Sequence, residues 1–433
     1  MFYYSTNNNK VRVDFREATI MGQASDKGLF FPEQIPALPK GFIKDIEKLS
    51  KEEIAFHVIQ PYVGNTIEKT NLEEIIAHTI NFDFPLQRIN DTIYALELFH
   101  GPTLAFKDVG ARFMSRCLNY FVKDEKKQFV VLVATSGDTG GAVANGFYDV
   151  EGVQVVILYP SEKVSYVQEK QLTALGRNIK AIEVEGSFDD CQRMVKHAFT
   201  DVDINQKLSL TSANSINIAR WLPQQFYYFF GYQQWNDKGH PPVVSVPSGN
   251  FGNLCAGLMA WRSGLPVDHF IAACNDNATI ANYLEKGDYI PGDTIHTLSN
   301  AMDVSDPSNF VRIMELFQHQ LPAIRNMVTA YNINDENTAA SINKLYHQYS
   351  YLSDPHGAVG FTALEHYLLH HPDKKGFFLE TAHPVKFENV VEPLIKTKIA
   401  IPEGLYHLLQ QKKESIKIKV DDTSLKSLLL SLQ

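Results

Sequence analysis

Cysteine is scarce in this sequence of 433 residues, and its few copies are far apart. The four, Cys117, Cys191, Cys255 and Cys274, form no Cys-x-x-Cys pair, so neither a zinc site nor a disulfide framework is indicated. No apolar stretch reaches the roughly 20 residues that a membrane-spanning helix needs. Residues 1–12 are polar and lack the apolar core of a signal peptide. We therefore expect a cytoplasmic protein with reduced cysteines, no metal site and no membrane partner.

An excess of positive charge is also missing. Lysine and arginine number 40 against 49 aspartate and glutamate residues, a formal net charge of −9, which argues against a nucleic-acid-binding surface. The composition, 44% hydrophobic and 21% charged, is that of a folded globular chain. Its length suffices for two or three domains. We expect a small-molecule substrate and a monomer or small homo-oligomer.

Strands and helices alternate along the chain after the first 90 residues. Near-continuous apolar runs at 129–134 and 153–159 are typical of strands buried in a parallel sheet, and such alternation favours βαβ units. The predicted fold class is α/β, with two parallel-rich α/β domains after a helix-rich accessory region. We place the accessory region at 1–92, the small domain at 93–225, and the large domain with a C-terminal extension at 226–433.

The periodicity also predicts individual elements. The stretch 308–350 and the tail from about 400 read as mainly helical. The other expected helices cover 50–63, 71–80, 141–148, 163–175, 187–200, 216–232 and 253–263, and the expected strands cover 93–99, 129–134, 153–159, 179–184, 208–211, 241–246, 269–274 and 376–381.

Lys107 has an unusual setting. It follows a Gly-Pro turn and the apolar pair Ala105-Phe106, and a helical pattern starts at Val109. A low dielectric and the positive end of a helix both disfavour the ammonium form. The resulting free amine can form a Schiff base with a carbonyl, pyridoxal phosphate being the commonest such cofactor. A snorkelling surface lysine is the alternative.

Three loops follow predicted strands, where α/β sheets bind ligands. The first contains Ser136-Gly137-Asp138-Thr139 before a predicted helix. Its exposed backbone N–H groups suit a carboxylate or a phosphate, although a capped tight turn would use the same residues.

In the second loop, Gly249 and Gly252 flank Asn250-Phe251, so the backbone can wrap closely round a phosphate. The loop lacks both the Walker lysine and the third glycine of a dinucleotide fingerprint. It therefore favours a cofactor with a single phosphate over a nucleotide.

The third loop starts at the end of the last predicted strand. Pro384 stops that strand and leaves Thr381 at its tip. A threonine in this position is commonly a capping hydroxyl.

Together with Lys107, these loops resemble the threonine synthase family, which are pyridoxal-phosphate (PLP) enzymes of fold type II, similar to the tryptophan synthase β subunit. The resemblance spans residues from about 26 to 390. The motifs that carry it are Lys27–Pro32, Leu98–Asp108, Ala134–Gly140, Asn214–Asn217, Ser245–Asn253, Asn300–Val304 and Thr381–Pro384.

The resemblance implies a role for each part of the site. Lys107 would hold PLP as a Schiff base and act as the base beside the substrate's α-carbon. Thr381 would face the pyridine nitrogen, and Asp138 the ring hydroxyl. The remaining implied contacts are with the cofactor phosphate through Gly249, Asn250, Phe251, Gly252 and Asn253, and with the substrate carboxylate through Ser136, Gly137 and Thr139.

The implied reaction converts O-phospho-L-homoserine and water to L-threonine and phosphate, by γ-elimination of phosphate and addition of water at the β-carbon. The substrate phosphate needs cations. Lys163, after a strand end, and Arg220, shortly after Asn214–Asn217, are the candidates. Solvated surface charge is the alternative for both.

Other functions remain possible on the sequence alone. A related PLP-dependent serine or threonine dehydratase would share the lysine and the glycine loop, but it needs no pocket for a second phosphate. A non-catalytic protein that binds PLP or a phosphorylated metabolite is a more distant alternative. A nucleotide-binding α/β protein is disfavoured because no Walker lysine follows Gly252.

Overall fold

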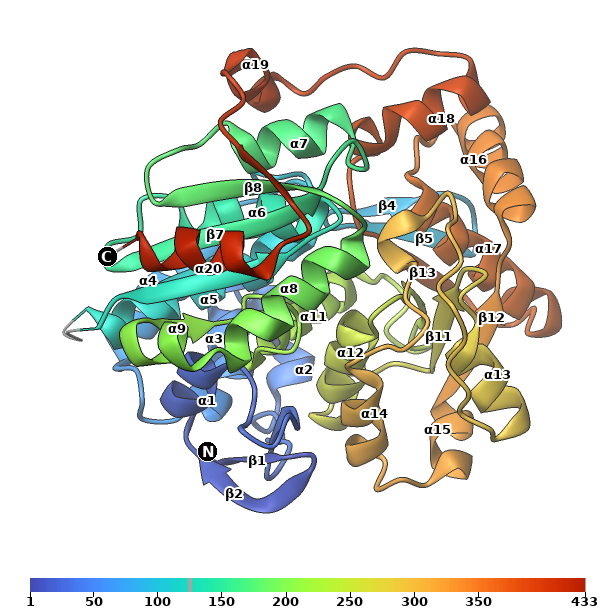
Figure 1. Ribbon diagram of the computed structural model, residues 1–433. Helices are drawn as coiled ribbons and strands as arrows, with labels where there is room; N and C mark the ends of the chain where they lie inside the picture. Colours follow the sequence, from blue (N-terminus) through green and yellow to red (C-terminus); the bar gives the residue numbers. More distant parts are fainter. Residues whose placement is uncertain (124–126, 433) are drawn as a thin grey trace.

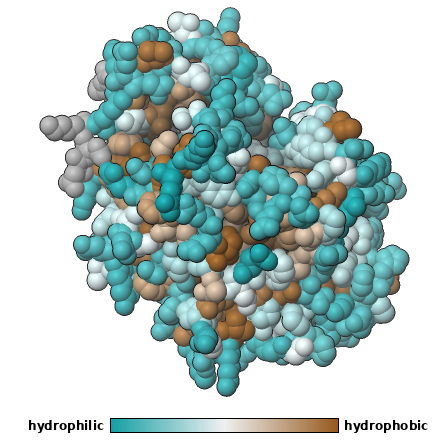
Figure 2. Space-filling view, turned by 90° about the horizontal axis from the view of Figure 1, so that it is seen from below, coloured by the Kyte–Doolittle hydropathy of each residue, from teal (hydrophilic) through white to brown (hydrophobic). Residues whose placement is uncertain are grey.

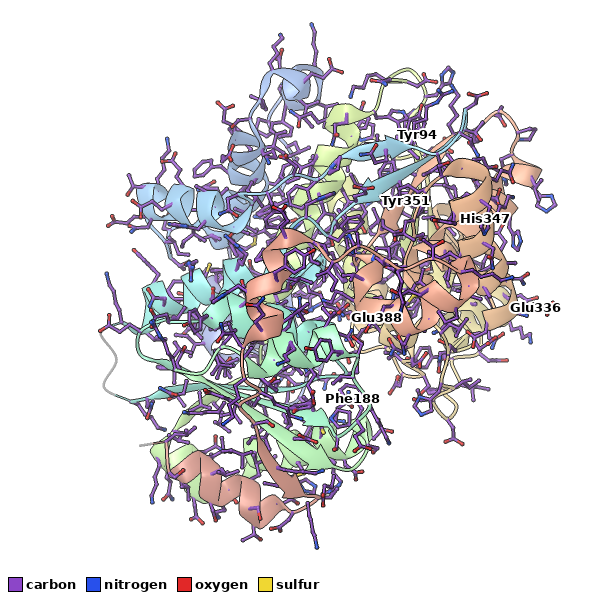
Figure 3. All side chains as sticks on the ribbon, turned by 90° about the horizontal axis from the view of Figure 1, so that it is seen from above. Tyr94, Phe188, Glu336, His347, Tyr351 and Glu388 are labelled. Carbon is purple, nitrogen blue, oxygen red and sulfur yellow. The ribbon has the colours of Figure 1, made fainter. Side chains whose placement is uncertain are left out.

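The structure, a computed structural model, describes residues 1–123 and 127–432. Two parallel-rich sheets flanked by helices make up most of the molecule, and a small antiparallel sheet lies near the N-terminus (Figure 1). This arrangement confirms the predicted α/β fold class. In Figure 3, the labelled Tyr94 and Tyr351 lie with the six-stranded sheet, and Phe188 lies with the five-stranded one.

The six-stranded sheet brings three of the predicted loops to one edge. All its neighbouring strands are parallel except β4 and β5. Because β10, β13 and β5 are adjacent, the loops at their carboxyl ends emerge side by side, where α/β sheets bind ligands. In sheet order the strands are β12 (Val328–Asn332), β11 (His269–Cys274), β10 (Val243–Pro247), β13 (Gly376–Glu380), β5 (Ile93–Glu97) and β4 (Leu86–Arg88).

The five-stranded sheet is parallel throughout. Every residue of its β6 is buried, and successive side chains point to opposite faces. Val131 and Val133 thus join one apolar cluster while Val130 and Leu132 join another. In sheet order the strands are β14 (Ile416–Lys419), β8 (Ile179–Glu185), β7 (Val153–Pro160), β6 (Phe129–Ala134) and β9 (Ser209–Thr211).

The N-terminal region combines helices with a small sheet that the sequence analysis did not predict. Capping boxes start two of its helices, from Asp14 and Glu17 and from Ser50 and Glu53. Its elements are β1 (Tyr3–Ser5), β2 (Asn8–Val13), α1 (Phe15–Met21), β3 (Phe30–Pro32), α2 (Phe42–Asp45), η1 (Ile46–Lys48), α3 (Lys51–Val63) and α4 (Lys69–Thr79).

Sixteen further helices surround the two large sheets in the described part of the chain. They are α5 (Lys107–Val122), α6 (Asp138–Phe147), α7 (Tyr166–Thr173), α8 (Phe188–Thr200), α9 (Val202–Lys207), α10 (Ile218–Trp221), α11 (Phe226–Gln234), α12 (Gly252–Arg262), α13 (Thr279–Lys286), α14 (Phe310–Leu316), α15 (Leu321–Met327), α16 (Asp335–Tyr349), α17 (Pro355–His370), α18 (Glu388–Ile395), α19 (Glu403–Gln410) and α20 (Asp422–Leu430). Short 3₁₀ turns are η2 (Leu222–Gln225), η3 (Asn300–Met302) and η4 (Pro384–Phe387).

Pairing in the sheets does not follow the chain order on which the predicted domain boundaries rest. The strand β5, at the start of the predicted small domain, pairs with β13 of the six-stranded sheet. The strand β14, from the predicted large domain, pairs with β8 of the five-stranded sheet. The chain therefore crosses between the sheets again near its end, where α18 packs on α16, α19 on α7 and α20 on α8 (Figure 1).

Apolar side chains are mostly turned inward. The face in Figure 2 is largely hydrophilic, with hydrophobic residues in small groups. Within residues 1–123 and 127–432, no helix has the length and apolar character that crossing a membrane requires.

Candidate active site

Lys107 is the first residue of α5, and its loop is fixed against the end of β13. The Phe106 N–H donates to the Thr381 carbonyl at 2.9 Å, and Ala105 forms an antiparallel bridge with Ala382. The predicted lysine and the predicted strand-end threonine therefore lie on adjoining backbones. The lysine side chain is 18% exposed.

Two lysines share one buried carboxylate beside this loop. The Lys107 Nζ lies 3.8 Å from Asp138 Oδ2, and the Lys386 Nζ lies 2.8 Å from Asp138 Oδ1. Burial lowers the pKa of Lys107; Asp138 partly offsets this effect, and the Lys386 charge adds to it. Lys107 thus has the setting of a reactive amine, not that of a snorkelling surface lysine.

Asp138 begins α6, whereas the sequence pattern placed the start of this helix at residue 141. Gln168 Nε2 also donates to its Oδ1, at 2.9 Å. Burial opposes ionisation of the carboxyl, but Lys386 and Lys107 outweigh it and hold the pKa of Asp138 well below its usual range. The loop before it is tight, because Thr135 Oγ1 accepts from the N–H groups of Gly137 at 3.0 Å and Gly140 at 2.8 Å.

In this loop, Ser136 and Thr139 are half-buried and Gly137 is buried. Gly137 has a φ of +140°, and a Cβ there would lie 2.5 Å from the Gln168 side chain. Only glycine fits this turn. The structure thus brings Ser136, Gly137 and Thr139 to the N-terminus of α6, next to Lys107 and Asp138.

The second loop enters α12 through Phe251, which adopts a left-handed conformation with φ of +60°. A Cβ on Gly249 would lie 2.6 Å from Met302 Cα, so this close approach needs glycine. The Asn250 side chain is used within the protein: it donates to Ser215 Oγ at 2.8 Å and accepts from the Ser308 N–H at 2.6 Å.

The N-terminus of α12 suits a single phosphate. Its first N–H groups have no carbonyl partner within the helix, and its first turn carries no acidic residue. The Asn253 Oδ1 accepts from Tyr227 at 2.7 Å and from Tyr228 at 2.8 Å. Its Nδ2 is buried without a hydrogen-bond partner among the described residues. Free donors at a helix N-terminus are what a phosphate requires.

Thr381 is buried and directly follows the last residue of β13, so it lies at the predicted tip of the strand. The neighbouring Ala382 N–H donates to Asp354 Oδ2 at 2.9 Å. Glu380 is fully buried, and burial together with Asp354 raises the pKa of its carboxyl well above the usual range. The strand end is therefore held by a buried polar network.

The two predicted phosphate-binding cations lie in different places. Lys163 is exposed and lines a pocket of about 330 Å³, together with Gln168, Asn300 and Lys386. Arg220 is buried, and its Nη1 donates to the Lys107 carbonyl at 3.3 Å. Arg220 is therefore not a solvated surface charge.

Arg220 also has an unsatisfied donor. Burial lowers the pKa of its guanidinium to about 10, and its Nε has no hydrogen-bond partner among the described residues. A buried guanidinium with a free donor is suited to an anion.

Sequence reasoning missed three residues of this site: Lys386, Gln168 and Asp354. A signal existed for Lys386, since it is the only charge in Pro384–Phe387, directly after a motif already singled out. For Gln168 and Asp354 the sequence offered none, because only the fold brings them to the loops.

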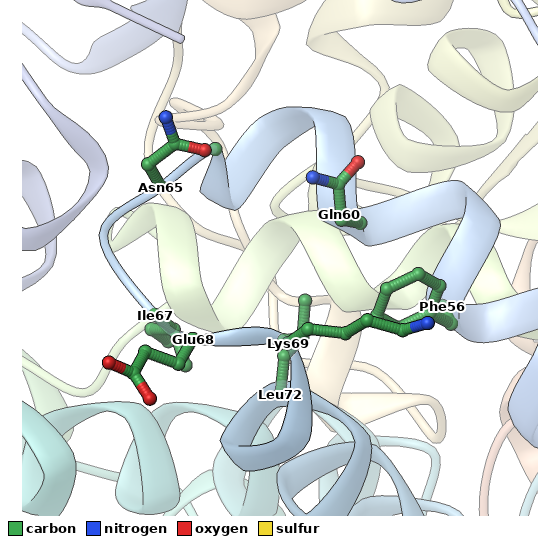
Figure 4. A pocket seen from close by; sticks show the side chains of 8 residues that line it. Phe56, Gln60, Asn65, Ile67, Glu68, Lys69 and Leu72 are labelled. Atoms are coloured by element: carbon green, nitrogen blue, oxygen red, sulfur yellow. The ribbon is translucent and has the colours of Figure 1, made fainter.

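A larger cavity, of about 500 Å³, lies between α3 and α4. Figure 4 shows Phe56, Gln60 and Lys69 among its lining side chains. It contains none of the predicted site residues. No group of three or more His, Cys, Asp or Glu side chains in the described ranges is arranged to hold a metal ion.

Comparison with known proteins agrees with this geometry. The family model for pyridoxal-phosphate dependent enzymes matches residues 76–377, that for the threonine synthase N terminus matches 2–80, and that for the threonine synthase C-terminal region matches 357–428. Threonine synthase from Escherichia coli is 40% identical over 434 residues, which cover all of both chains. The chain belongs to the threonine synthase family.

Solved structures place it in the same family. The crystal structure of the Escherichia coli threonine synthase has a TM-score of 0.93, and the match covers 100% of each chain. PLP-bound threonine synthase from Brucella melitensis is 32% identical, with a TM-score of 0.92 over 99% of this chain and 98% of that one. The chain is thus a PLP-dependent lyase of fold type II, and the predictions of family, activity and cofactor are confirmed.

More distant enzymes share the fold alone. Threonine deaminase from Solanum lycopersicum is 14% identical, with a TM-score of 0.56, and the match covers 76% of this chain and 95% of that one. The dehydratase alternative therefore has much weaker support than membership of the threonine synthase family.

Proposed function

We propose that this chain converts O-phospho-L-homoserine and water to L-threonine and phosphate at the cluster of Lys107, Asp138 and Lys386. The observation that carries the proposal is the position of the Lys107 amine. It lies 3.8 Å from the buried Asp138 carboxylate in the first turn of α6, and its loop leaves the same edge of the six-stranded sheet as the loop before α12. Each of these two helix N-termini can bind an anion.

Three parts of the site would bind PLP. The free N–H groups at Gly252 and Asn253, with Gly249, Asn250 and Phe251 shaping the loop, would bind the cofactor phosphate. Thr381 would offer a neutral hydroxyl to the ring nitrogen, and Asp138 would face the ring hydroxyl. When bound, PLP supplies an electron sink next to the substrate's α-carbon.

Lys107 would move protons in this reaction. Its amine would hold the cofactor through the aldehyde carbon and, once the substrate amine is bound there instead, would serve as a base beside the α-carbon. Protons leave the α- and β-carbons, the γ C–O bond breaks and phosphate departs. A proton then adds at the γ-carbon, the hydroxyl of a water molecule adds at the β-carbon, and a proton returns to the α-carbon.

The substrate's two anionic groups would bind at opposite ends. Ser136, Gly137 and Thr139, at the N-terminus of α6, would hold the carboxylate. Lys163 and Arg220 are our candidates for the phosphate, supported by the pocket that Lys163 lines and by the free Nε of Arg220. A dehydratase substrate such as serine has no group for such cations.

The test is a direct assay of the purified chain with PLP. We expect threonine and phosphate in equal amounts from O-phosphohomoserine, and much slower turnover of serine. Borohydride should remove the visible absorbance and leave the pyridoxyl group on Lys107. Faster turnover of serine than of O-phosphohomoserine would overturn the proposal in favour of a dehydratase. The cytoplasmic location and the monomeric or small homo-oligomeric state remain predictions from the sequence.

A further inference from the structure

Lys386 is a fully buried cation for which the reaction described so far gives no task. It lies in η4, and its side chain has no exposed surface. Its Nζ donates to Asp138 Oδ1 at 2.8 Å and to the Thr103 carbonyl at 2.8 Å. An apolar side chain of this length would fill the same space without desolvating a charge. The position therefore calls for a reason beyond packing.

The two lysines lie at unequal distances from the Asp138 carboxylate. Lys386 and Gln168 bind Oδ1 at 2.8 and 2.9 Å, whereas Lys107 faces Oδ2 at 3.8 Å. Lys386 thus orients Asp138 and offsets part of its negative charge. The attraction of Asp138 for a proton on Lys107 is correspondingly weaker.

The other charges near Lys107 do not replace this effect. The charged groups that act on it are Asp138, Lys386, Arg220 and Asp354. Asp354 accepts from the N–H groups of His356, Gly357 and Ala382, and Arg220 is fixed on the Lys107 carbonyl. Asp138 is therefore the group whose charge most favours the ammonium form of Lys107, and Lys386 is the stronger of the two cations, with Arg220, whose charges oppose it.

We propose that Lys386 is a positioning residue that pairs with Asp138 and thereby keeps Lys107 a free amine, ready to bind the cofactor aldehyde. The inference rests on the proposed function, in which Lys107 is the residue that binds the cofactor. It adds a fixed internal cation whose task is to prevent a closed Lys107–Asp138 ion pair.

The experiment measures the reactivity of Lys107 against pH in the full-length chain freed of cofactor. The probe is pyridoxal, which lacks the phosphate, followed by borohydride and peptide mapping. Labelling rises as the amine loses its proton, so its midpoint reports the proton affinity of Lys107. In Lys386→Met and Lys386→Gln we expect that midpoint to move upward by on the order of one pH unit, because Asp138 then attracts the proton without competition.

Two variants and one control keep the test decisive. The Gln side chain retains a donor for Asp138 and Thr103, so Lys386→Gln decides the matter if the Met variant does not fold. Lys398→Met removes an exposed lysine that pairs with Glu392, and its midpoint should match the parent. A purely structural role for Lys386 would lower the urea midpoint of unfolding and leave the labelling midpoint in place.

The outcomes separate the inference from the function beneath it. Labelling of Lys107 with an unchanged midpoint in a folded Lys386 variant overturns the role of Lys386 alone. If pyridoxal is found on another lysine in the parent chain, the assignment of Lys107 fails, and this inference fails with it.

Discussion

The helices α6 and α12 start in the same way, yet they are equipped for different anions. Each follows a fully buried parallel strand and a glycine-containing loop. Asp138 stands in the first turn of α6, whereas the first turn of α12 has no acid. The partial positive charge of a helix N-terminus is strongest in that turn. The negative charge of Asp138 therefore already offsets part of the positive charge at the N-terminus of α6.

This difference indicates which helix N-terminus binds the more highly charged anion. A phosphate near Asp138 would meet a like charge, while a substrate carboxylate with one charge can still bind the N–H groups of the loop. At α12 the donors are free, and Asn253 adds an unpaired Nδ2 among the described residues. A single acidic residue thus distinguishes two helix N-termini that both follow a buried parallel strand.

Removing the Lys107 amine should have the largest effect on turnover. In Lys107→Ala, turnover of O-phosphohomoserine should fall at least about 10³-fold, because the neighbouring Lys386 is held by Asp138 and the Thr103 carbonyl and does not replace the base. The visible absorbance of bound PLP should disappear as well. Steady-state kinetics and the absorbance spectrum measure both, and near-normal turnover would refute the assignment.

Crowding the α12 loop should affect the cofactor most. In Gly252→Val, the new Cβ would lie 3.2 Å from Asn309 Nδ2 and stand near the N–H groups that bind the phosphate. We expect the PLP dissociation constant to rise about tenfold or more, about 1.4 kcal/mol. Equilibrium dialysis measures it, and Gly292→Val, where a Cβ meets no atom within 4 Å, is the matched control.

Removing the carboxylate in the first turn of α6 should lower the stability of the protein. Asp138→Asn leaves Lys386 buried without its counter-charge, which should lower the free energy of unfolding at pH 7 by about 3 kcal/mol. Since the folded pKa of Asp138 lies below its unfolded value, the parent's advantage is full above about pH 4 and is lost as the pH falls further. Urea unfolding of both chains from pH 7 to pH 3 should show this convergence; a difference that stays constant would contradict it.

Binding of the substrate phosphate should depend on Lys163 and Arg220, which belong to neither α6 nor α12. Lys163→Ala should reduce kcat/KM for O-phosphohomoserine on the order of tenfold to a hundredfold, the value of one charge-assisted contact. Arg220→Ala should do the same. PLP content should stay normal in each. Serine is the control substrate, and an equal loss on serine would assign the residue to the fold or to the cofactor instead.

The smallest effect should come from a change at Thr381, directly after β13. Thr381→Asp would place a carboxylate near the pyridine nitrogen and raise the pKa of that nitrogen. We expect a shifted absorbance maximum and a changed product distribution, with cofactor content close to the parent's. An unchanged spectrum together with unchanged products would show that Thr381 is not the partner of the ring.

The sequence predicted most of the two large sheets because their strands are buried on both faces. The ranges 129–134 and 269–274 match β6 and β11 residue for residue, since a short continuous apolar run is typical of a strand in the interior of a parallel sheet. The strands β4, β12 and β14 were not predicted. They lie at sheet edges and are partly exposed, so their residues carry the polar character of surface helices or tails.

The site was predictable where one loop contains the whole signal. Lys107, Gly252 and Thr381 lie in long local motifs, and the structure brings their loops to one edge of the six-stranded sheet. Lys386 and Gln168 act on Asp138 from distant parts of the chain, across 248 and 30 residues. Such contacts exist only after folding, and no local pattern encodes them.

The last strand has a consequence for how the protein is made. The strand β8 gains its outer neighbour only from Ile416–Lys419, and α7, which carries Gln168, is held by the same segment: the Glu414 N–H donates to the Thr173 carbonyl at 2.8 Å. A chain still on the ribosome, or one cut before residue 414, keeps every predicted site residue. It nevertheless leaves one sheet edge open to other chains, and α7 keeps its packing on α6 but loses its hydrogen bond with Glu414. Synthesis must therefore pass Lys419 before β8 and α7 have all their neighbours.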